Sequence, residues 1–192
     1  AIPLRVALFD PATGTHHGDE LLMLTEVQQN VRFEGFAAPP ILSINRGFSA
    51  PVIVETNRSQ DDLAFLSARD DDPFARYEAM QQLMVNVLVG AIAGQPVDDA
   101  AVVAAVRNTI SDPLLNPAFV AEAIRLPSEA YLGDQMAVVD PDAIHAARES
   151  LQRRIGADLA PLWRDIHSRT KANGFSLSPA AKGARKLRNA AL

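Results

Sequence analysis

The histidines are the side chains in this sequence whose chemistry most favours a metal. His16 and His17 are adjacent, with two acidic residues close behind them, but neighbouring side chains rarely reach one ion together, so we expect a solvated loop. His145 and Glu149 are four residues apart and share one helix face. A zinc site needs a third ligand and often a general base, and the sequence contains no His-Glu-x-x-His. We therefore expect an exposed helical pair, and we expect His167 to stabilise the C-terminal end of a helix.

Two clusters of like charge are candidate sites for an ion. The run 70–72 is all aspartate but lacks the spaced oxygen ligands of a calcium loop, and carboxylates at a helix N-terminus are explained by the helix dipole. Four basic residues near the end of the sequence have no interleaved aromatics, which favours a solvated or interdomain helix face over nucleic-acid binding. They are Lys182, Arg185, Lys186 and Arg188. Gly-rich phosphate loops and G-x-S-x-G are also missing from the sequence. We predict no catalytic, cofactor-binding or metal-binding residue in this chain, and no cofactor.

Composition narrows the classes of partner. The 192 residues carry a formal net charge of -5, so no domain-wide positive field exists to attract nucleic acid. The lack of cysteine removes disulfides, thiol catalysis and cysteine-ligated zinc, and it fits a reducing compartment, so we expect a cytoplasmic protein. No apolar run reaches the roughly 20 residues of a membrane span, so no membrane partner is expected.

The stretch from Asp72 to Gly94 is predicted to be the helix around which the chain is organised. Asp72 can cap it, and Pro73 fits the first helical position. Apolar residues, including Leu83 and Val87, recur at three- and four-residue steps and form one broad face. Gly94, with a proline two residues later, is a stop signal.

Strands are predicted before this helix, at 2–9, 21–24, 26–33, 41–45 and 51–56. The third is predicted from its alternation of apolar and polar residues. We expect a small antiparallel sheet of four or five strands, which is too few to close a sandwich alone. The composition changes from strand-like to helical between Val54 and Ser59, so domains of 1–57 and 58–192 are predicted.

Helices are predicted throughout residues 58–192. Ser59 begins a capping box, and a capping residue followed by proline recurs along the chain. These pairs begin at Asp72, Asp112, Asn116, Asp140 and Ser178. The long run from Pro141 to about Thr170 contains Pro161, which should kink or split it. Trp163 and Tyr131 are expected in the core. The predicted fold class is α+β in two modules: a partial antiparallel β-sandwich, then an irregular all-α array of armadillo or HEAT type.

Both ends of the sequence suggest a fragment, because the start lacks methionine and the end reads as an uncapped helix. A truncated sheet presents an unpaired edge and an uncovered apolar face. We therefore expect self-association through the β part. The residues expected near that contact are Val6, Leu8, Val27, Val31 and Phe33.

The order of several short stretches is similar to one family. Phe48-Ser49-Ala50-Pro51-Val52 is the most specific, and the others begin at Asp72 (DPFARYEA), Leu126 (LPSE), Asp140 (DPDAI) and Lys186 (KLRNA). On these stretches the chain resembles the M1 zinc aminopeptidases, in particular the bacterial aminopeptidase N branch, over essentially its whole length.

This resemblance implies that residues 1–57 are the latter part of a small Ig-like β-sandwich domain. Residues 58–192 would begin the C-terminal helical domain, which caps the active-site cavity. The family's zinc ligands, catalytic Glu, substrate-amine motif and transition-state Tyr lie in an upstream catalytic domain and match no position here. Zinc is thus expected in the parent enzyme and not in this fragment. The expected partners are that catalytic domain, the remaining helices of the same chain, and peptide substrates of the parent.

Two hypotheses from different classes remain open. The first is a non-catalytic fragment of a zinc metallo-aminopeptidase that removes N-terminal residues from peptides. It would act as a spacer and the beginning of a helical lid, and it would be inactive alone. The alternative is a free-standing helical array that binds a partner. The full open reading frame discriminates between them, because a zinc-peptidase motif upstream would establish the first.

Overall fold

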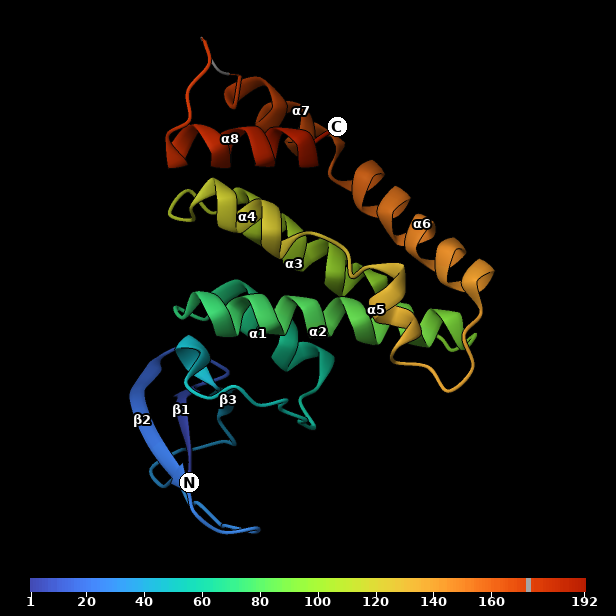
Figure 1. Cartoon of the computed structure of the whole chain (residues 1–192). Coiled ribbons are helices and arrows are strands. Elements are labelled where there is room, and N and C mark those ends of the chain that lie inside the picture. The colour runs from blue at the N-terminus through green and yellow to red at the C-terminus, as the bar shows by residue number, and fades with distance from the viewer. Residues whose placement is uncertain (172–173) are drawn as a thin grey trace. The chain divides into compact units, whose positions relative to one another are not determined.

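The computed structural model describes residues 1–171 and 174–192, which form two compact units, Ala1–Ala79 and Met80–Leu192 (Figure 1). A small antiparallel sheet lies in the first unit, and the second unit is helical. This is the predicted α+β fold class. Among the described helices, none combines the length and the apolar character that crossing a bilayer requires.

The first unit contains three strands, a short 3₁₀ turn, one helix and the beginning of a second. These are β1 (Ile2–Phe9), β2 (His16–Leu24), β3 (Ile41–Ile44), η1 (Arg46–Phe48), α1 (Gln60–Arg69) and the start of α2 (Pro73–Ile92). Because α1 contacts β3 within this unit, the unit extends beyond the strands into the helical sequence. The domain boundary at residue 57 stays a prediction.

The strands form an antiparallel sheet in the order β2-β1-β3. The central strand β1 is the near-continuous apolar run of the sequence, and from Val6 to Phe9 every residue is buried. Such a run suits a strand that is covered on both faces. Val6 and Leu8 are therefore core residues, and the prediction that they lie at an intermolecular contact is wrong.

Two predicted strands do not form, so the described residues hold three strands where four or five were predicted. Residues 26–33 are irregular, and Val27 is fully exposed. The Gln29 side chain bonds back to the chain, donating from Nε2 to the Met23 carbonyl (3.2 Å) and accepting from the Thr25 N–H (3.2 Å). Such local bonds compete with strand pairing. Residues 51–56 are also irregular, and Pro51 at their start has no N–H for a ladder.

The helix α2 begins and ends as predicted. Asp72 Oδ1 accepts the Ala75 N–H (2.8 Å) at its N-terminus. At its C-terminus Gly94 has a φ of +69°, and its N–H donates to the Ala91 carbonyl (3.0 Å). The next N–H, of Gln95, donates to the Gly90 carbonyl (2.9 Å). This pair of bonds is a Schellman motif, which a glycine favours because it adopts positive φ without strain.

The second unit continues α2 with six further helices in its described residues. These are α3 (Asp99–Ser111), α4 (Pro117–Ala123), α5 (Glu129–Gly133), α6 (Pro141–Asp158), α7 (Ala160–Arg169) and α8 (Pro179–Ala190). Side chains of Asn116, Asp140 and Ser178 cap α4, α6 and α8, each with proline at the first helical position. Asp112 does not begin a helix as predicted. It follows the last residue of α3, and its carboxylate accepts the Leu114 N–H (3.0 Å) in a turn.

The predicted long helix is divided near Pro161. Leu159 leaves the helical conformation (φ −110°, ψ 13°) between α6 and α7, and its side chain is fully buried. Proline lacks the N–H that would continue the ladder, whereas the first turn of a helix tolerates it. Pro161 accordingly lies in the first turn of α7.

The core of the second unit is built from the apolar faces of these helices. Leu83, Met84 and Val106 are among its fully or almost fully buried side chains. Figure 1 shows α8 alongside α4. Of the two aromatics predicted in the core, Tyr131 is 52% exposed, so that prediction is wrong. Trp163 is half-buried.

Candidate functional site

A buried arginine, Arg46, is the most concentrated polar feature of the first unit. It begins η1, directly after Asn45, which has a positive φ of 59°. Asparagine tolerates this left-handed conformation better than most residues. The Asn45 side chain holds the turn closed, accepting from the Ala50 N–H (2.9 Å) and donating to the Ala50 carbonyl (3.1 Å). Arg46 is thereby directed inward and is only 3% exposed.

Three carboxylates surround the Arg46 guanidinium. Nη1 lies 2.5 Å from Asp70 Oδ1, and Nη2 lies 2.7 Å from Asp71 Oδ1. Nε lies 2.8 Å from Asp19 Oδ1, but no hydrogen bond is aligned along Nε within the described residues. The arginine therefore joins β2, through Asp19, to the connection between α1 and α2.

The pKa values of the two carboxylates bonded to Arg46 shift in opposite directions. Burial raises the pKa of Asp70, although the Asp72 N–H and the charge of Arg46 oppose that rise. Burial also disfavours the charge on Asp71, but the hydrogen bond and charge of Arg46 outweigh it and lower the pKa of Asp71. The difference follows from exposure, since the Asp70 side chain is fully buried and that of Asp71 is 61% exposed.

The helix dipole thus explains only part of the acidic run 70–72. Only Asp72 has the predicted place, capping α2, and it also accepts the Gly47 N–H (3.0 Å). Asp70 and Asp71 neutralise Arg46. The prediction that a helix N-terminus explains all three residues is therefore wrong for two of them. Sequence spacing gave no signal of this pairing, because Arg46 is 24 residues from Asp70.

His16 and His17 lie on β2 and not in the predicted loop. The His16 ring stacks on Phe9, with centroids 5.1 Å apart, and Nδ1 lies 3.6 Å from Asp71 Oδ2. The His17 ring meets Phe36 edge to face at 4.8 Å. The described residues contain no group of three or more metal-binding side chains, here or elsewhere.

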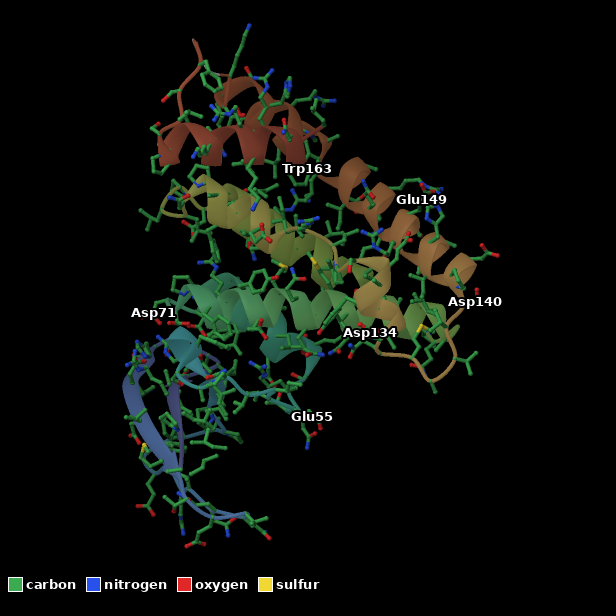
Figure 2. All side chains as sticks on the ribbon, viewed as in Figure 1. Glu55, Asp71, Asp134, Asp140, Glu149 and Trp163 are labelled. Atoms are coloured by element: carbon green, nitrogen blue, oxygen red, sulfur yellow. The ribbon has the colours of Figure 1, made fainter. Side chains whose placement is uncertain are left out.

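His145 and Glu149 form an exposed pair on α6, as predicted; Figure 2 labels Glu149 and, at the start of the helix, Asp140. His145 has a nearer partner that the sequence did not indicate: its Nδ1 lies 3.0 Å from Glu129 Oε1, on α5. That hydrogen bond, and then the Glu129 charge, raise the pKa of His145. The cluster is an exposed link between α5 and α6.

The basic residues of α8 serve mostly as contacts within the second unit. Lys186 forms an ion pair with Glu122 of α4. Arg188 Nη1 donates to the His167 carbonyl (2.9 Å), at the C-terminal end of α7. Arg185 lies over the Phe175 ring, with Cζ 5.4 Å from the centroid. The side chain of Lys182 is exposed, as predicted for a solvated face.

A groove of about 650 Å³ lies in the second unit. Helices α3, α4, α6, α7 and α8 line it, and Trp163 lies in its wall with Nε1 donating to the Ile155 carbonyl (3.2 Å). Figure 2 shows Trp163 between α8 and α6. Its size is within the range of ligand pockets, about 300–1,000 Å³. Sequence reasoning did not predict this groove, because its lining comes from five helices that only the tertiary fold brings together.

The arrangement of these groups supports binding and packing and contains no catalytic constellation. No nucleophile–base pair and no metal-ligand set is found among the described side chains named above. The Arg46 cluster is a buried clamp, and the groove is an open surface with positive side chains. The function of these groups therefore depends on the larger protein to which they belong.

Comparison with known proteins gives a consistent answer along the chain. A family model described as a domain of unknown function with an Ig-like fold, DUF3458, matches residues 1–57. A second, described as ARM repeats, DUF3458_C, matches residues 60–192. These matches agree with a sheet module followed by a helical array.

Aminopeptidases are among the most similar proteins. Aminopeptidase N of Caulobacter vibrioides is 39% identical over 174 residues, which cover 89% of this chain and 20% of that protein. Aminopeptidase N of Escherichia coli is 29% identical over 203 residues, covering 100% of this chain and 23% of that protein. The crystal structure of Legionella pneumophila aminopeptidase A in complex with aspartic acid superposes with a TM-score of 0.88 at 26% identity, over 99% of this chain and 23% of that one.

The chain spans about a fifth of the length of the curated relatives it matches. The DUF3458 models match the sheet and helical parts in the order in which the sequence places them. The chain therefore belongs to the aminopeptidase N branch of the M1 family, with an Ig-like part followed by an ARM-repeat part.

Proposed function

We propose that this chain is a non-catalytic part of an aminopeptidase that removes N-terminal residues from peptides. The observation that carries the proposal is the 39% identity to Caulobacter aminopeptidase N over 89% of this chain. The aminopeptidase structure from Legionella adds support, because it superposes on 99% of this chain with a TM-score of 0.88.

Zinc does not fit the donor set of this chain. The sequence has no His-Glu-x-x-His, and the described residues contain no group of three side chains suited to a metal. We therefore assign no step of peptide hydrolysis to residues of this chain, and the zinc of the parent enzyme is proposed to be bound by another part of the longer polypeptide.

The role proposed for this part is mechanical. Residues 1–57 would act as a spacer, and residues 58–192 would begin the helical lid over the active site. The buried Arg46 cluster supports this role by joining the sheet to the connection between α1 and α2. The matched relatives are four to five times longer than the region they share with this chain, which supports neighbours in the same polypeptide. The proposed location is the cytoplasm, supported by the absence of cysteine.

Activity measurements on two proteins test this proposal. The product of the full open reading frame is expected to hydrolyse alanyl p-nitroanilide and to lose that activity on chelation of zinc. Residues 1–192 alone are expected to be inactive in the same assay. An inactive, zinc-free full-length product would contradict the aminopeptidase assignment, and hydrolysis by residues 1–192 alone would contradict the non-catalytic role.

A further inference from the structure

The lining of the groove in the second unit is unusual in its charge. Four cationic side chains reach it: Arg125 at the end of α4, Arg148 on α6, Arg164 on α7 and Lys186 on α8. The described residues that line it include no Asp or Glu. The chain as a whole is acidic, with a net charge of -5, so this local positive excess runs against the overall balance.

Two of these cations are already neutralised inside the unit. Lys186 pairs with Glu122, and Arg148 donates from Nε to the Pro127 carbonyl (2.7 Å) while Nη1 lies 3.5 Å from Glu129 Oε1.

The other two cations have no ion pair among the described residues. They are Arg125 and Arg164, both exposed. Arg125 lies just after the end of α4 and Arg164 lies on α7, and each contributes to the lining of the same groove. The charge of Arg125 also acts on the Glu122 carboxylate, which already pairs with Lys186. An anionic group bound in the groove can therefore interact with two guanidinium groups that form no ion pair among the described residues, and guanidinium groups are well suited to carboxylates.

The rest of the lining is mostly apolar, with Gln152 and Asn189 as its uncharged polar members. Ile124, Ile155 and Trp163 contribute to it, and Gly156 leaves open space, since a Cβ added there meets nothing within 4 Å. A ligand that fits this lining presents apolar side chains to the floor and carboxylates to the rim. Several residues that line the groove are exposed, so the groove is open to solvent and is not an enclosed cavity. A polypeptide segment can therefore bind in it.

We propose that this groove binds an acidic, leucine-containing segment of the longer aminopeptidase polypeptide. The inference rests on the proposed function for the source of the segment, because the matched relatives extend far beyond the shared region. The chemistry of the segment is argued from the groove alone: apolar side chains fill the space beside Trp163 and Gly156, and carboxylates pair with Arg125 and Arg164.

The single tryptophan of the chain reports directly on the groove. The probe is a synthetic 16-residue helix-forming peptide with leucines on one face and glutamates on the other. Its matched control has glutamine at every glutamate position. Calorimetry measures binding to residues 1–192, and Trp163 emission shows whether the peptide occupies the groove. The acidic peptide is expected to bind about tenfold or more tightly than the glutamine peptide, and to weaken as salt is added.

Substitutions in the groove test where the peptide binds. Arg125→Gln and Arg164→Gln are each expected to weaken binding by about 3- to 10-fold, since each removes one charge pair. Gly156→Leu should block the groove without changing its charge. Arg153→Gln is the control, because Arg153 lies on α6, is exposed and pairs with Glu149 outside the groove. Thermal melting of every variant establishes that it is folded.

Three results would overturn the inference. The first is equal affinity for the acidic and glutamine peptides, and the second is binding without a change in Trp163 emission. The third is emission that changes with the concentration of residues 1–192 alone, which would assign the groove to a second copy. All are independent of peptidase activity, so failure here and failure of the proposed function are distinguishable.

Discussion

The guanidinium of Arg46 and the carboxylate of Asp70 lie 2.5 Å apart (Nη1 to Oδ1), and both side chains are buried. The pair connects the turn after β3 to the end of α1, so it fixes a helix onto the sheet inside the first unit. A buried ion pair is not itself strong evidence for stability, because desolvation offsets much of the attraction. Loss of one partner, however, leaves an uncompensated charge.

Replacing Arg46 should therefore be severe. Arg46→Met is expected to lower the free energy of unfolding by about 3–5 kcal/mol, because Asp70 is left buried and unpaired. The loss should be smaller at pH 5 than at pH 7.5, since a buried carboxyl can neutralise by binding a proton. Asp71→Asn is the control: this side chain is 61% exposed, and its loss should cost no more than about 1 kcal/mol. Equal urea midpoints for wild type and Arg46→Met would contradict the clamp.

His145 should give the second unit a stability that declines as the pH rises above the ordinary pKa of histidine. Its pKa is raised by the hydrogen bond and charge of Glu129. The folded state therefore holds the proton more tightly than the unfolded state, and the contribution is complete below the unfolded pKa of about 6.5. It is lost as the pH rises through the folded pKa. Melting temperatures across pH 5.5–8.5 should show this fall, and His145→Gln should remove it. A His145 ring signal that titrates below its ordinary pKa would contradict the assignment.

The broad apolar face of α2 should be costly to truncate. Leu83 is fully buried and Val87 is 2% exposed, so Leu83→Ala is expected to destabilise by about 2–5 kcal/mol through the lost contacts and the cavity. Val87→Ala removes less volume and should cost somewhat less. Asn86→Ala, on the exposed face of the same helix, should stay within about 0.5 kcal/mol. Unchanged denaturant midpoints for the first two variants would show that the face is not buried.

Two glycines in helices should respond in opposite ways to a larger side chain. A Cβ at Gly183 on α8 would lie 3.0 Å from the Ala118 nitrogen, so Gly183→Val should cost about 1–3 kcal/mol by overpacking against α4. A Cβ at Gly156 on α6 meets nothing within 4 Å, so Gly156→Ala should stabilise by about 0.5–1 kcal/mol through helix propensity. Thermal unfolding compares them. No destabilisation by Gly183→Val would contradict the packing of α8 on α4, and destabilisation by Gly156→Ala would contradict the open space beside Gly156.

The sequence signals that predicted the structure correctly are local. The capping residues Asn116, Asp140 and Ser178 and the stop at Gly94 each act within a few residues, so spacing alone predicted where helices begin and end. The apolar period of α2 likewise predicted its buried face, since Leu83 and its neighbours on that face are covered.

The errors in prediction arose where long-range contacts decide. The segment 26–33 alternates like a strand, but no neighbouring strand pairs with it among the described residues. Arg46 finds its partners 24 and 25 residues away, and the groove draws lining residues from five helices. Neither hydrophobic periodicity nor a sequence motif encodes contacts between such distant residues. The Arg46 cluster and the groove could therefore be identified only in the folded structure.

Strand β2 forms one edge of the sheet. Within the part of the chain that the structure describes, β2 pairs only with β1, and an unpaired edge offers N–H and C=O groups to another chain. Its first half carries histidines and acidic residues, which discourage pairing, whereas Leu21 and Met23 in its second half are 59% and 45% exposed. We expect self-association of residues 1–192 through this second half, with Val27 close by, measured as a mass that rises with concentration in light scattering. Leu21→Lys should reduce that rise, and Leu114→Lys, at an exposed apolar position between α3 and α4, should leave it unchanged. A monomeric mass at millimolar concentration, or an equal effect of both substitutions, would show that the β2 edge does not recruit a second chain.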